Sequence, residues 1–205
     1  MNKILQISIL CALAFTMISM RVHQAVQIGD KAPDFNLKNV DGTMKSPSDY
    51  KDAKGLILVF TCNHCPFSQI YESRIIELHN KYAPKGYPVI AINPNDPVVE
   101  PDDSFEEMQK RAKTMKYPFD YLVDETQMTA KAYGAARTPH VFIIEKKPGA
   151  NVVRYIGAID DNADNAAAAN NRYVELAVES LLAGKEVAMP ETKAIGCTVK
   201  WKKTQ

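Results

Sequence analysis

Three unbroken apolar runs give the first indication of the fold. Residues 56–60, 89–92 and 141–144 have no polar interruption, which is typical of central strands covered on both faces. A fourth strand is expected at 152–159, after a Pro148-Gly149 turn. Because a helical segment separates the first two runs and the last two follow one another directly, the expected sheet is mixed.

After the first run, the apolar spacing changes to that of a helix. Apolar residues recur every three or four positions, with charged residues between them: Phe67, Tyr71, Ile75, Leu78 and Tyr82. Pro84 and Gly86 end this helix. Further helices are expected at 105–115, where Ser104 and Glu107 form a capping-box signature, at 126–133 and at 173–181. We expect an edge strand or hairpin within 28–41, a short strand at 119–123 and a loop at 160–171.

Composition and charge exclude several classes of protein. The chain has 205 residues, 46% of them hydrophobic, which suits one globular domain with additional segments. The 25 basic and 24 acidic residues give a net charge of +1, with no long basic run. Binding to nucleic acid through phosphates is therefore not expected, nor is binding to a membrane surface through a polybasic patch.

The N-terminal segment has the pattern of an export signal. A short cationic start is followed by a mostly apolar stretch over residues 4–20. We interpret residues 1–25 as a signal peptide, with cleavage after Ala25, and expect a periplasmic or extracellular protein. An uncleaved anchor is the alternative, and cleavage would leave no stable membrane association. Removal of this segment also removes Cys11, which leaves three cysteines in an oxidising compartment.

The candidate chemistry lies in Cys62-Asn63-His64-Cys65, where the first strand is expected to lead into a helix. Two cysteines three positions apart at a helix start are about 5–6 Å apart, within the range of a disulfide. The helix N-terminus favours the thiolate, so we expect Cys62 to be an exposed nucleophile of low pKa and Cys65 its buried partner. Half of a zinc site and an inert disulfide are the alternatives, but the sequence offers no second cysteine pair for zinc.

These residues resemble the thioredoxin-like superfamily, and in particular its redoxin branch of peroxiredoxin-like and cytochrome-maturation-type members. The resemblance covers residues 26–185, and its carriers are 56–60, the CxxC, 91–93, and Thr138-Pro139 before 141–144. It implies an α/β three-layer sandwich with a mixed sheet, an N-terminal extension, and an insert at 96–123 after the first βαβ unit. The implied division is a domain at 26–190 and a tail at 191–205. Residues 196–202 are similar to the ending of a peroxiredoxin-like subgroup.

The resemblance also assigns roles within the site. It implies a cis peptide bond before Pro139, which faces the CxxC, and a Thr138 backbone that binds a substrate chain. Where thioredoxins have Trp and Pro, this chain has Thr61 and His64. An imidazolium at His64 is expected to stabilise the Cys62 thiolate and to make the disulfide more oxidising.

The central strand lacks the buried carboxylate of thioredoxins, so the proton acceptor is open. His64 and His140 are the candidates, although a surface or capping position for His140 is an equal alternative. Asp160 and Asp161 are interpreted as a solvated loop.

Three functions remain open from the sequence. The first is a secreted thiol–disulfide oxidoreductase in which Cys62 attacks, Cys65 resolves, and Thr138 and Pro139 bind the substrate. Its partners are protein thiols and disulfides and a redox protein, and neither a cofactor nor a metal is expected. The second is a thiol peroxidase, although the Pro and Thr that precede a peroxidatic cysteine have no match here. The third is a non-catalytic binding module, which an intact CxxC disfavours.

The last cysteine, Cys197, lies in a tail with few apolar residues. Ile195, Cys197, Val199 and Trp201 alternate with other residues, which predicts a short strand with one buried side. On this interpretation Cys197 and Trp201 point inward, and Cys197 is a small structural hydrophobe. A third redox thiol that relays or resolves the Cys62–Cys65 disulfide is the alternative.

Overall fold

A computed structural model describes residues 25–203 of the chain. Residues 1–24 of the expected signal peptide lie outside this part, so the signal peptide stays a prediction. The helices are α2 (Pro66–Tyr82), α3 (Phe105–Met115), α4 (Met128–Tyr133) and α5 (Tyr173–Leu182), with 3-10 turns η1 (Pro47–Asp49), η2 (Ala83–Lys85), η3 (Pro101–Asp103) and η4 (Ala166–Ala168). The strands are β1 (Leu37–Asn39), β2 (Met44–Lys45), β3 (Gly55–Phe60), β4 (Val89–Asn93), β5 (Asp120–Val123), β6 (Arg137–Thr138), β7 (His140–Lys147), β8 (Ala150–Gly157) and β9 (Cys197–Thr198).

A mixed sheet forms the centre of the molecule. Within residues 25–203, seven strands lie in the order β2-β1-β5-β4-β3-β7-β8. Strand β3 runs parallel to β4 and antiparallel to β7, and β4 runs parallel to β5. Every residue of β3 and β4 is buried, as the unbroken apolar runs predict. The mixed sheet expected from the order of the elements is therefore confirmed.

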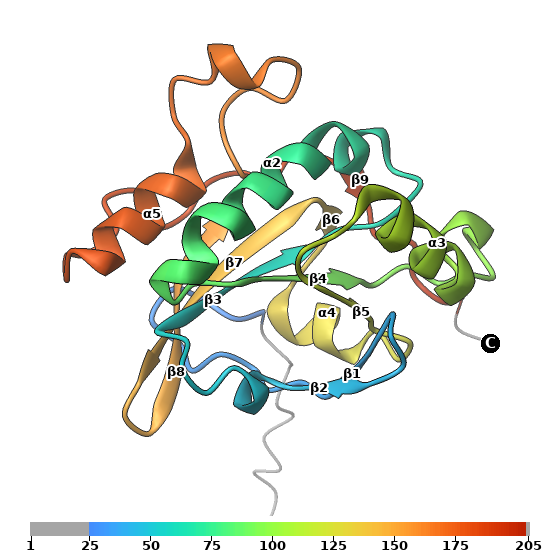
Figure 1. Cartoon of the computed structure of the whole chain (residues 1–205), viewed down its shortest axis with the longest axis horizontal. Coiled ribbons are helices and arrows are strands. Elements are labelled where there is room, and N and C mark those ends of the chain that lie inside the picture. Colours follow the sequence, from blue (N-terminus) through green and yellow to red (C-terminus); the bar gives the residue numbers. More distant parts are fainter. Residues whose placement is uncertain (1–24, 204–205) are drawn as a thin grey trace, which may run out of the picture.

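Helices cover both faces of the sheet (Figure 1). On β3, Ile57 and Val59 pack in the same core cluster as side chains of α2 and α5, whereas Leu58 and Phe60 pack in a second cluster with α4 and the N-terminal segment. The strand alternation sends successive side chains to opposite faces, so one strand supplies both cores. This is the expected three-layer α/β sandwich, and the sheet positions β3 so that its C-terminal end leads into α2.

The smaller elements differ in detail from the sequence pattern. The Asp41-Gly42 turn is present, but it joins β1 to β2, so the edge hairpin begins later than residue 28. The helix expected at 126–133 begins at Met128, and the short strand expected at 119–123 is β5.

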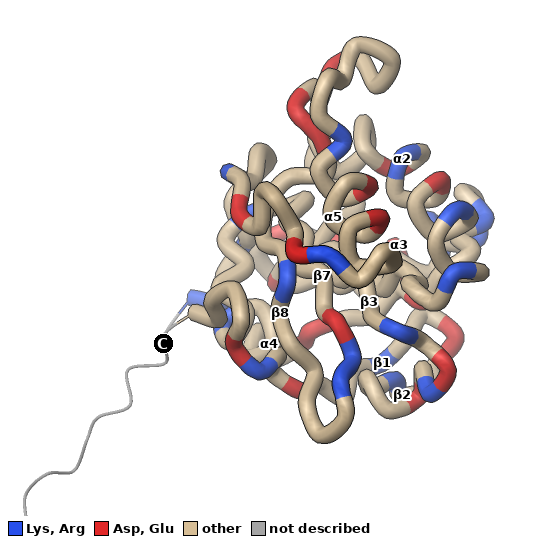
Figure 2. The backbone as a smooth tube through the Cα atoms, turned by 90° about the vertical axis from the view of Figure 1, so that its left-hand side faces the viewer, with Lys and Arg blue, Asp and Glu red and all other residues tan. Residues whose placement is uncertain are grey.

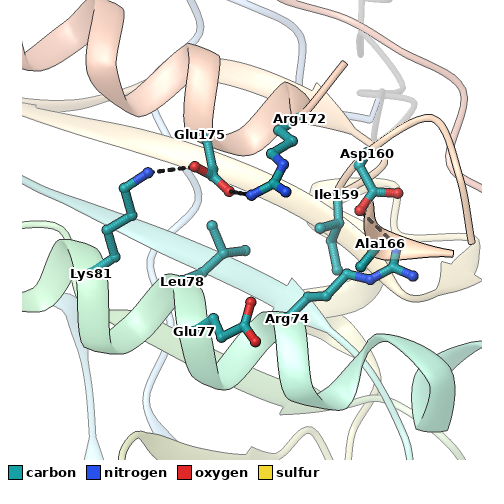
Figure 3. A pocket seen from close by; sticks show the side chains of 9 residues that line it. All are labelled: Arg74, Glu77, Leu78, Lys81, Ile159, Asp160, Ala166, Arg172 and Glu175. Carbon is teal, nitrogen blue, oxygen red and sulfur yellow. Dashed lines mark hydrogen bonds and ion pairs between the residues drawn. The ribbon is translucent and has the colours of Figure 1, made fainter. Parts of the chain in front are cut away.

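The loop at 160–171 contains a buried ion pair, which corrects the interpretation of Asp160 as solvated. The Asp160 side chain is 5% exposed, and Arg74 Nη1 of α2 lies 2.7 Å from its Oδ2 (Figure 3). The Tyr71 hydroxyl donates to Asp160 Oδ1 at 2.9 Å. Arg74 also donates to the carbonyl oxygens of Asn162 and Ala163, so one arginine fixes the start of the loop. Asp161 remains at the surface.

The tail follows the domain closely. Its backbone binds β8 through hydrogen bonds from Ile156 to Pro190 and from Thr192 to Ile156. Further on, β9 pairs antiparallel with β6. Within this segment, Val199 is 4% exposed, whereas Trp201 is 37% exposed. The expectation that Trp201 points inward is therefore wrong, because β9 ends at Thr198 and its alternation does not continue to Trp201.

Charges of both signs are interspersed over the described chain in the view of Figure 2. This distribution matches the near-zero net charge of the sequence. Of the helices within residues 25–203, none is long and apolar enough to cross a bilayer.

Candidate functional site

The CxxC motif occupies the junction between β3 and α2. Strand β3 ends at Phe60, and α2 begins at Pro66 with Cys65 as its N-cap residue. Proline suits the first helical position because it has no backbone N–H and its φ is already helical. The two cysteines therefore lie at the end of a buried strand and at the start of a helix, as the sequence predicts.

Thr138 joins the two cysteines from the other side of the site. Its hydroxyl Oγ1 lies 3.3 Å from Cys62 Sγ, and the Cys65 thiol donates to its carbonyl oxygen at 3.2 Å. Thr138 itself has no exposed surface. The peptide bond between Thr138 and Pro139 is cis, as the resemblance implies. The backbone edge of Thr138, which was expected to bind a substrate chain, is paired with Cys197 of β9.

Both thiols of the motif are buried. Cys62 is 4% exposed and Cys65 is fully buried, so the expectation of an exposed Cys62 is wrong. The motif lies under Thr138 and the loop that carries Asp103, and these two segments are distant in sequence. The order of accessibility is still as expected, since Cys62 is the less buried of the two.

The protonation of one thiol of the CxxC affects that of the other. Cys62 lowers the pKa of Cys65 to about 4, whereas Cys65, burial and the charge of Asp103 raise the pKa of Cys62. Because the two thiols of the CxxC exchange one proton between them, the expected low pKa of Cys62 stays a prediction. The contact that fixes Cys65 is its own S–H, which donates to the Thr138 carbonyl oxygen.

His64 is held by two carboxylates. Its Nδ1 lies 2.5 Å from Asp103 Oδ2 and 3.6 Å from Cys62 Sγ, and its Nε2 lies 3.5 Å from Glu100 Oε2. The Asp103 carboxylate also accepts hydrogen bonds from the backbone amide of Asn63 at 2.6 Å and from the Asn95 side chain at 2.7 Å. His64 thus lies beside Cys62 as predicted, with its Nδ1 oriented toward an anion.

Comparison with known proteins now decides the family. The family model described as "AhpC/TSA family" matches residues 28–156, which is more than half of the chain. The chain belongs to the AhpC/TSA family. This AhpC/TSA-family chain is 26% identical over 148 residues to "Thiol-disulfide oxidoreductase ResA" of Geobacillus thermodenitrificans, across 71% of this chain and 80% of that protein. The expected redoxin family is confirmed, and the redox class of the enzyme with it.

Solved structures confirm the fold. A crystal structure of an uncharacterized conserved protein from Geobacillus kaustophilus is 39% identical, covers 87% of this chain and 94% of its own, and superposes with a TM-score of 0.81. The thioredoxin domain of a thiol-disulfide oxidoreductase from Bacteroides vulgatus is 16% identical, covers 77% of this chain and 99% of its own, and has a TM-score of 0.56. The AhpC/TSA-family chain therefore has a thioredoxin-like fold.

Cys62, His64 and Asp103 are also the residues that could hold a metal ion in this AhpC/TSA-family protein. One ligand atom from each lies within 4.8 Å of the others. Two ligands that are each about 2.0–2.2 Å from a tetrahedral zinc ion are roughly 3.3 Å apart. The 2.5 Å between His64 Nδ1 and Asp103 Oδ2 is instead a hydrogen-bond distance, so metal binding would require these two side chains to separate.

His140 is partly buried at the start of β7, at the position that pairs with Phe60 of β3. Its ring packs 4.6 Å from that of Phe142, and among the described residues its buried Nδ1 has no hydrogen-bond partner. Burial, with a smaller effect of Arg137, lowers the pKa of His140 to about 4. The ring is therefore partly buried and neutral near pH 7, so it is poorly suited to hold a proton from the CxxC.

The sequence analysis missed two acidic residues at the site. Asp103 comes from η3, about 40 positions after the motif, in a proline-rich loop whose only signal was the Asp102-Asp103 pair before a helix cap. Glu72 of α2 lines the same small cavity as Cys62, and its carboxylate accepts hydrogen bonds from Arg111 at 2.9 and 3.0 Å and from Tyr117. Its helical position i+7 from Cys65 gave no indication of this arrangement.

Proposed function

We propose that this protein is a thiol–disulfide oxidoreductase that exchanges the Cys62–Cys65 dithiol or disulfide with protein substrates. The observation that supports this proposal most strongly is the contact of both sulfurs with one residue, Thr138, at 3.3 and 3.2 Å. A dithiol held in this way can close to a disulfide with little movement of the backbone. The match to curated relatives called thiol-disulfide oxidoreductases supports the same class.

In the proposed reaction, Cys62 is the attacking sulfur because it is the less buried of the two. In the resting protein the Cys65 thiol keeps its proton and donates it to the Thr138 carbonyl oxygen. Attack requires Cys62 to lose its own proton to the medium, which leaves a thiolate beside the Thr138 hydroxyl. The Cys62 thiolate then forms a mixed disulfide with the substrate and releases one substrate thiolate, which takes up a proton from the medium.

Cys65 completes the exchange. It attacks the Cys62 sulfur, forms the Cys62–Cys65 disulfide, and releases the second substrate thiol with its proton. Both steps conserve atoms, and two electrons pass from the dithiol to the substrate disulfide. In the reverse direction the same steps oxidise a substrate dithiol.

His64 and Thr138 have positioning roles in this proposal. The Thr138 hydroxyl lies 3.3 Å from Cys62 Sγ and can donate to the thiolate, while the His64 ring lies 3.6 Å away. The His64 ring lies between the Asp103 carboxylate and the Cys62 sulfur and separates them. Loss of either group changes the energy of the reduced form more than that of the oxidised form, because only the reduced form carries a thiolate.

The proposed location follows from the sequence of residues 1–25 and from the chemistry. Disulfide exchange with protein substrates suits an oxidising compartment, where such bonds persist. We therefore propose an exported protein that acts in the periplasm or outside the cell. The thiol peroxidase alternative is not favoured, because the residues expected before a peroxidatic cysteine are not present in either register.

The test is a comparison of two single variants of the CxxC. Cys65→Ser removes the resolving thiol, so Cys62 is expected to accumulate in mixed disulfides with proteins that carry disulfides. Cys62→Ser is the matched control and is expected to trap no protein. Non-reducing electrophoresis followed by mass spectrometry identifies the linked cysteine. Trapping by Cys62→Ser in place of Cys65→Ser would contradict the assigned roles, and trapping by neither would contradict the function.

A further inference from the structure

The C-terminal strand occupies the edge that faces the thiols. Strand β9 pairs with β6 so that Cys197 lies directly opposite Thr138, the residue that contacts both Cys62 and Cys65. The approach is close: a Cβ at Gly196 would lie 2.1 Å from the Thr138 carbonyl oxygen, so only glycine fits there. The Cys65 and Cys197 thiols are close enough for each to shift the pKa of the other, and Cys65 is one cause of the raised pKa of Cys197. The third cysteine is therefore part of the thiol cluster.

Hydrogen bonds on both sides of Cys197 fix its position. Before it, Arg137 donates to the Gly196 carbonyl oxygen at 2.8 Å. After it, the backbone amide of Val199 binds the Ala136 carbonyl oxygen at 3.1 Å, and that of Lys200 binds Asn95 Oδ1 at 2.8 Å. The tail thus holds Cys197 in a defined place against the domain, which a purely space-filling residue in a loose tail would not require.

The three sulfurs are arranged in an order that suits disulfide exchange. Cys65 is the central one: it contacts Thr138, which lies opposite Cys197 on β9 and also contacts Cys62, and it raises the pKa of both other cysteines. Cys197 is partly exposed, whereas both thiols of the CxxC are buried. In a thiol–disulfide exchange the attacked sulfur lies between the attacking and the leaving sulfur. Cys65 meets this condition when Cys197 attacks and Cys62 leaves.

We propose that Cys197 is a third redox thiol that exchanges with the Cys62–Cys65 disulfide and converts it into a Cys65–Cys197 disulfide. This inference rests on the proposed function, which supplies the Cys62–Cys65 disulfide. Cys197 attacks Cys65 Sγ, the Cys65–Cys197 bond forms, and the Cys62–Cys65 bond breaks. The proton of Cys197 passes to the departing Cys62 sulfur, so the step is an isomerisation that needs no further oxidant.

The exchange transfers the oxidising equivalent from a buried site to a more accessible one. The new disulfide includes the partly exposed Cys197 sulfur, where the dithiol of a redox partner protein can attack. That dithiol becomes a disulfide, and Cys65 and Cys197 return to thiols. In the reduced protein, burial and the neighbouring Cys65 raise the pKa of Cys197 to about 11. Oxidation of Cys65 to a disulfide removes the effect of its thiol on the pKa of Cys197. Attack by Cys197 is therefore favoured once the Cys62–Cys65 disulfide has formed.

A Cys65–Cys197 disulfide would also fix β9 to the backbone edge of Thr138, where a substrate chain is expected to bind. A substrate chain that pairs with the Thr138 backbone has to take the place of Cys197, because that edge is already paired. A Cys65–Cys197 bond prevents this replacement until a partner reduces it. Cys197 therefore separates two steps in time: disulfide exchange between Cys62 and the substrate, and the later reduction by a partner protein that restores the Cys62–Cys65 dithiol.

The experiment uses the full chain with Cys11→Ser, so that the remaining thiols are those of the cluster. The protein is reduced, oxidised with one equivalent of oxidised glutathione, quenched with acid, alkylated and mapped by mass spectrometry without reduction. The expected result is a Cys65–Cys197 linked peptide together with the Cys62–Cys65 linkage. In a Cys62→Ser variant, the two remaining thiols are expected to be lost together to one Cys65–Cys197 disulfide.

Cys65→Ser is the matched control, because it leaves Cys62 and Cys197 without the central sulfur. It is expected to form glutathione adducts and no Cys62–Cys197 disulfide. A wild-type map with only the Cys62–Cys65 linkage, glutathione adducts alone in Cys62→Ser, or an equal yield of intramolecular disulfide in Cys65→Ser would each overturn the proposal. These readouts need no protein substrate, so a failure here is distinct from a failure to trap partner proteins, which tests the proposed function. Circular dichroism of each variant verifies that it is folded.

Discussion

Two buried polar clusters lie along α2, and they differ in what their partners can do. At the start of the helix, Cys62 lies beside His64, which is bound to Asp103. Further along, Arg74 is bound to Asp160 with Tyr71 beside it. Each cluster connects the helix region to a loop distant in sequence. In the second, a permanently charged guanidinium meets a carboxylate, whereas in the first every member can gain or lose a proton and the sulfurs can exchange bonds.

The Arg74–Asp160 cluster therefore has a structural role, and the thiol cluster has a chemical one. Arg74 uses Nη1 and Nη2 on Asp160 and two backbone carbonyl oxygens, so its charge and hydrogen bonds are satisfied in one arrangement. The thiol cluster can keep the same neighbours in more than one protonation state, because a proton can lie on either cysteine of the CxxC. Fixed partners stabilise a fold, and exchangeable partners permit a reaction. The predictions below test this distinction.

The largest effect is expected from Arg74→Ala. The variant leaves the Asp160 carboxylate buried without its cation, which typically costs about 3–5 kcal/mol of unfolding free energy. Lys81→Ala is the matched control from the same helix, since Lys81 pairs with Glu175 at the surface (Figure 3) and such pairs contribute about 0–1 kcal/mol. Urea unfolding followed by circular dichroism measures both. Equal losses in the two variants would contradict the structural role of the Arg74 cluster.

A smaller effect, on pH dependence, is expected from His140. Its pKa is lowered to about 4 in the folded protein, from about 6.5 in the unfolded chain. Since the unfolded chain binds the proton more readily, the stability from a neutral His140 is present above pH 6.5 and is lost as the pH falls to 4. The shift corresponds to about 3 kcal/mol. His140→Leu is expected to flatten the unfolding free energy between pH 6.5 and 4, and an unchanged slope would argue against a buried neutral ring.

The sequence predicts the central strand and helix of the fold well, because the patterns that indicate them are local. The apolar run in β3, the helical spacing of α2 and the position of the CxxC between them all lie within about 30 consecutive residues. The three-layer arrangement follows from these patterns and from the resemblance. The strand alternation on β3 then divides the core between the two faces.

The parts that the sequence could not predict are contacts between distant segments. Asp103 reaches His64 from a loop without periodicity, and β9 is a two-residue strand that pairs with β6 about 60 positions earlier. Cys62 is buried by these same segments, so its exposure could not be judged from the motif alone. Asp160 appeared solvated because a polar loop gives no sign of an arginine on another helix.

The smallest predicted effects are opposite shifts of the reduction potential within the thiol cluster. His64→Pro removes the ring that separates the Asp103 carboxylate from Cys62, so the disulfide is expected to become harder to reduce. Asp103→Asn removes the charge that helps to raise the pKa of Cys62, so the disulfide is expected to become easier to reduce. A shift of 30 mV, about 1.4 kcal/mol for this two-electron couple, is the scale to resolve in glutathione redox buffers. Shifts in the same direction would contradict the electrostatic account.

The central claim is that the Cys62–Cys65 pair exchanges disulfides with proteins, and one measurement tests it most directly. The reduced protein is mixed with an equimolar amount of insulin as a disulfide-bonded substrate. Free thiols are then alkylated, and the disulfides of both proteins are counted by mass spectrometry. The account predicts that one insulin disulfide is lost for each disulfide gained by the thiol cluster, and that Cys62→Ser abolishes this transfer. Intact insulin disulfides, together with hydrogen peroxide consumption that depends on Cys62 or Cys65, would contradict the account and identify a thiol peroxidase.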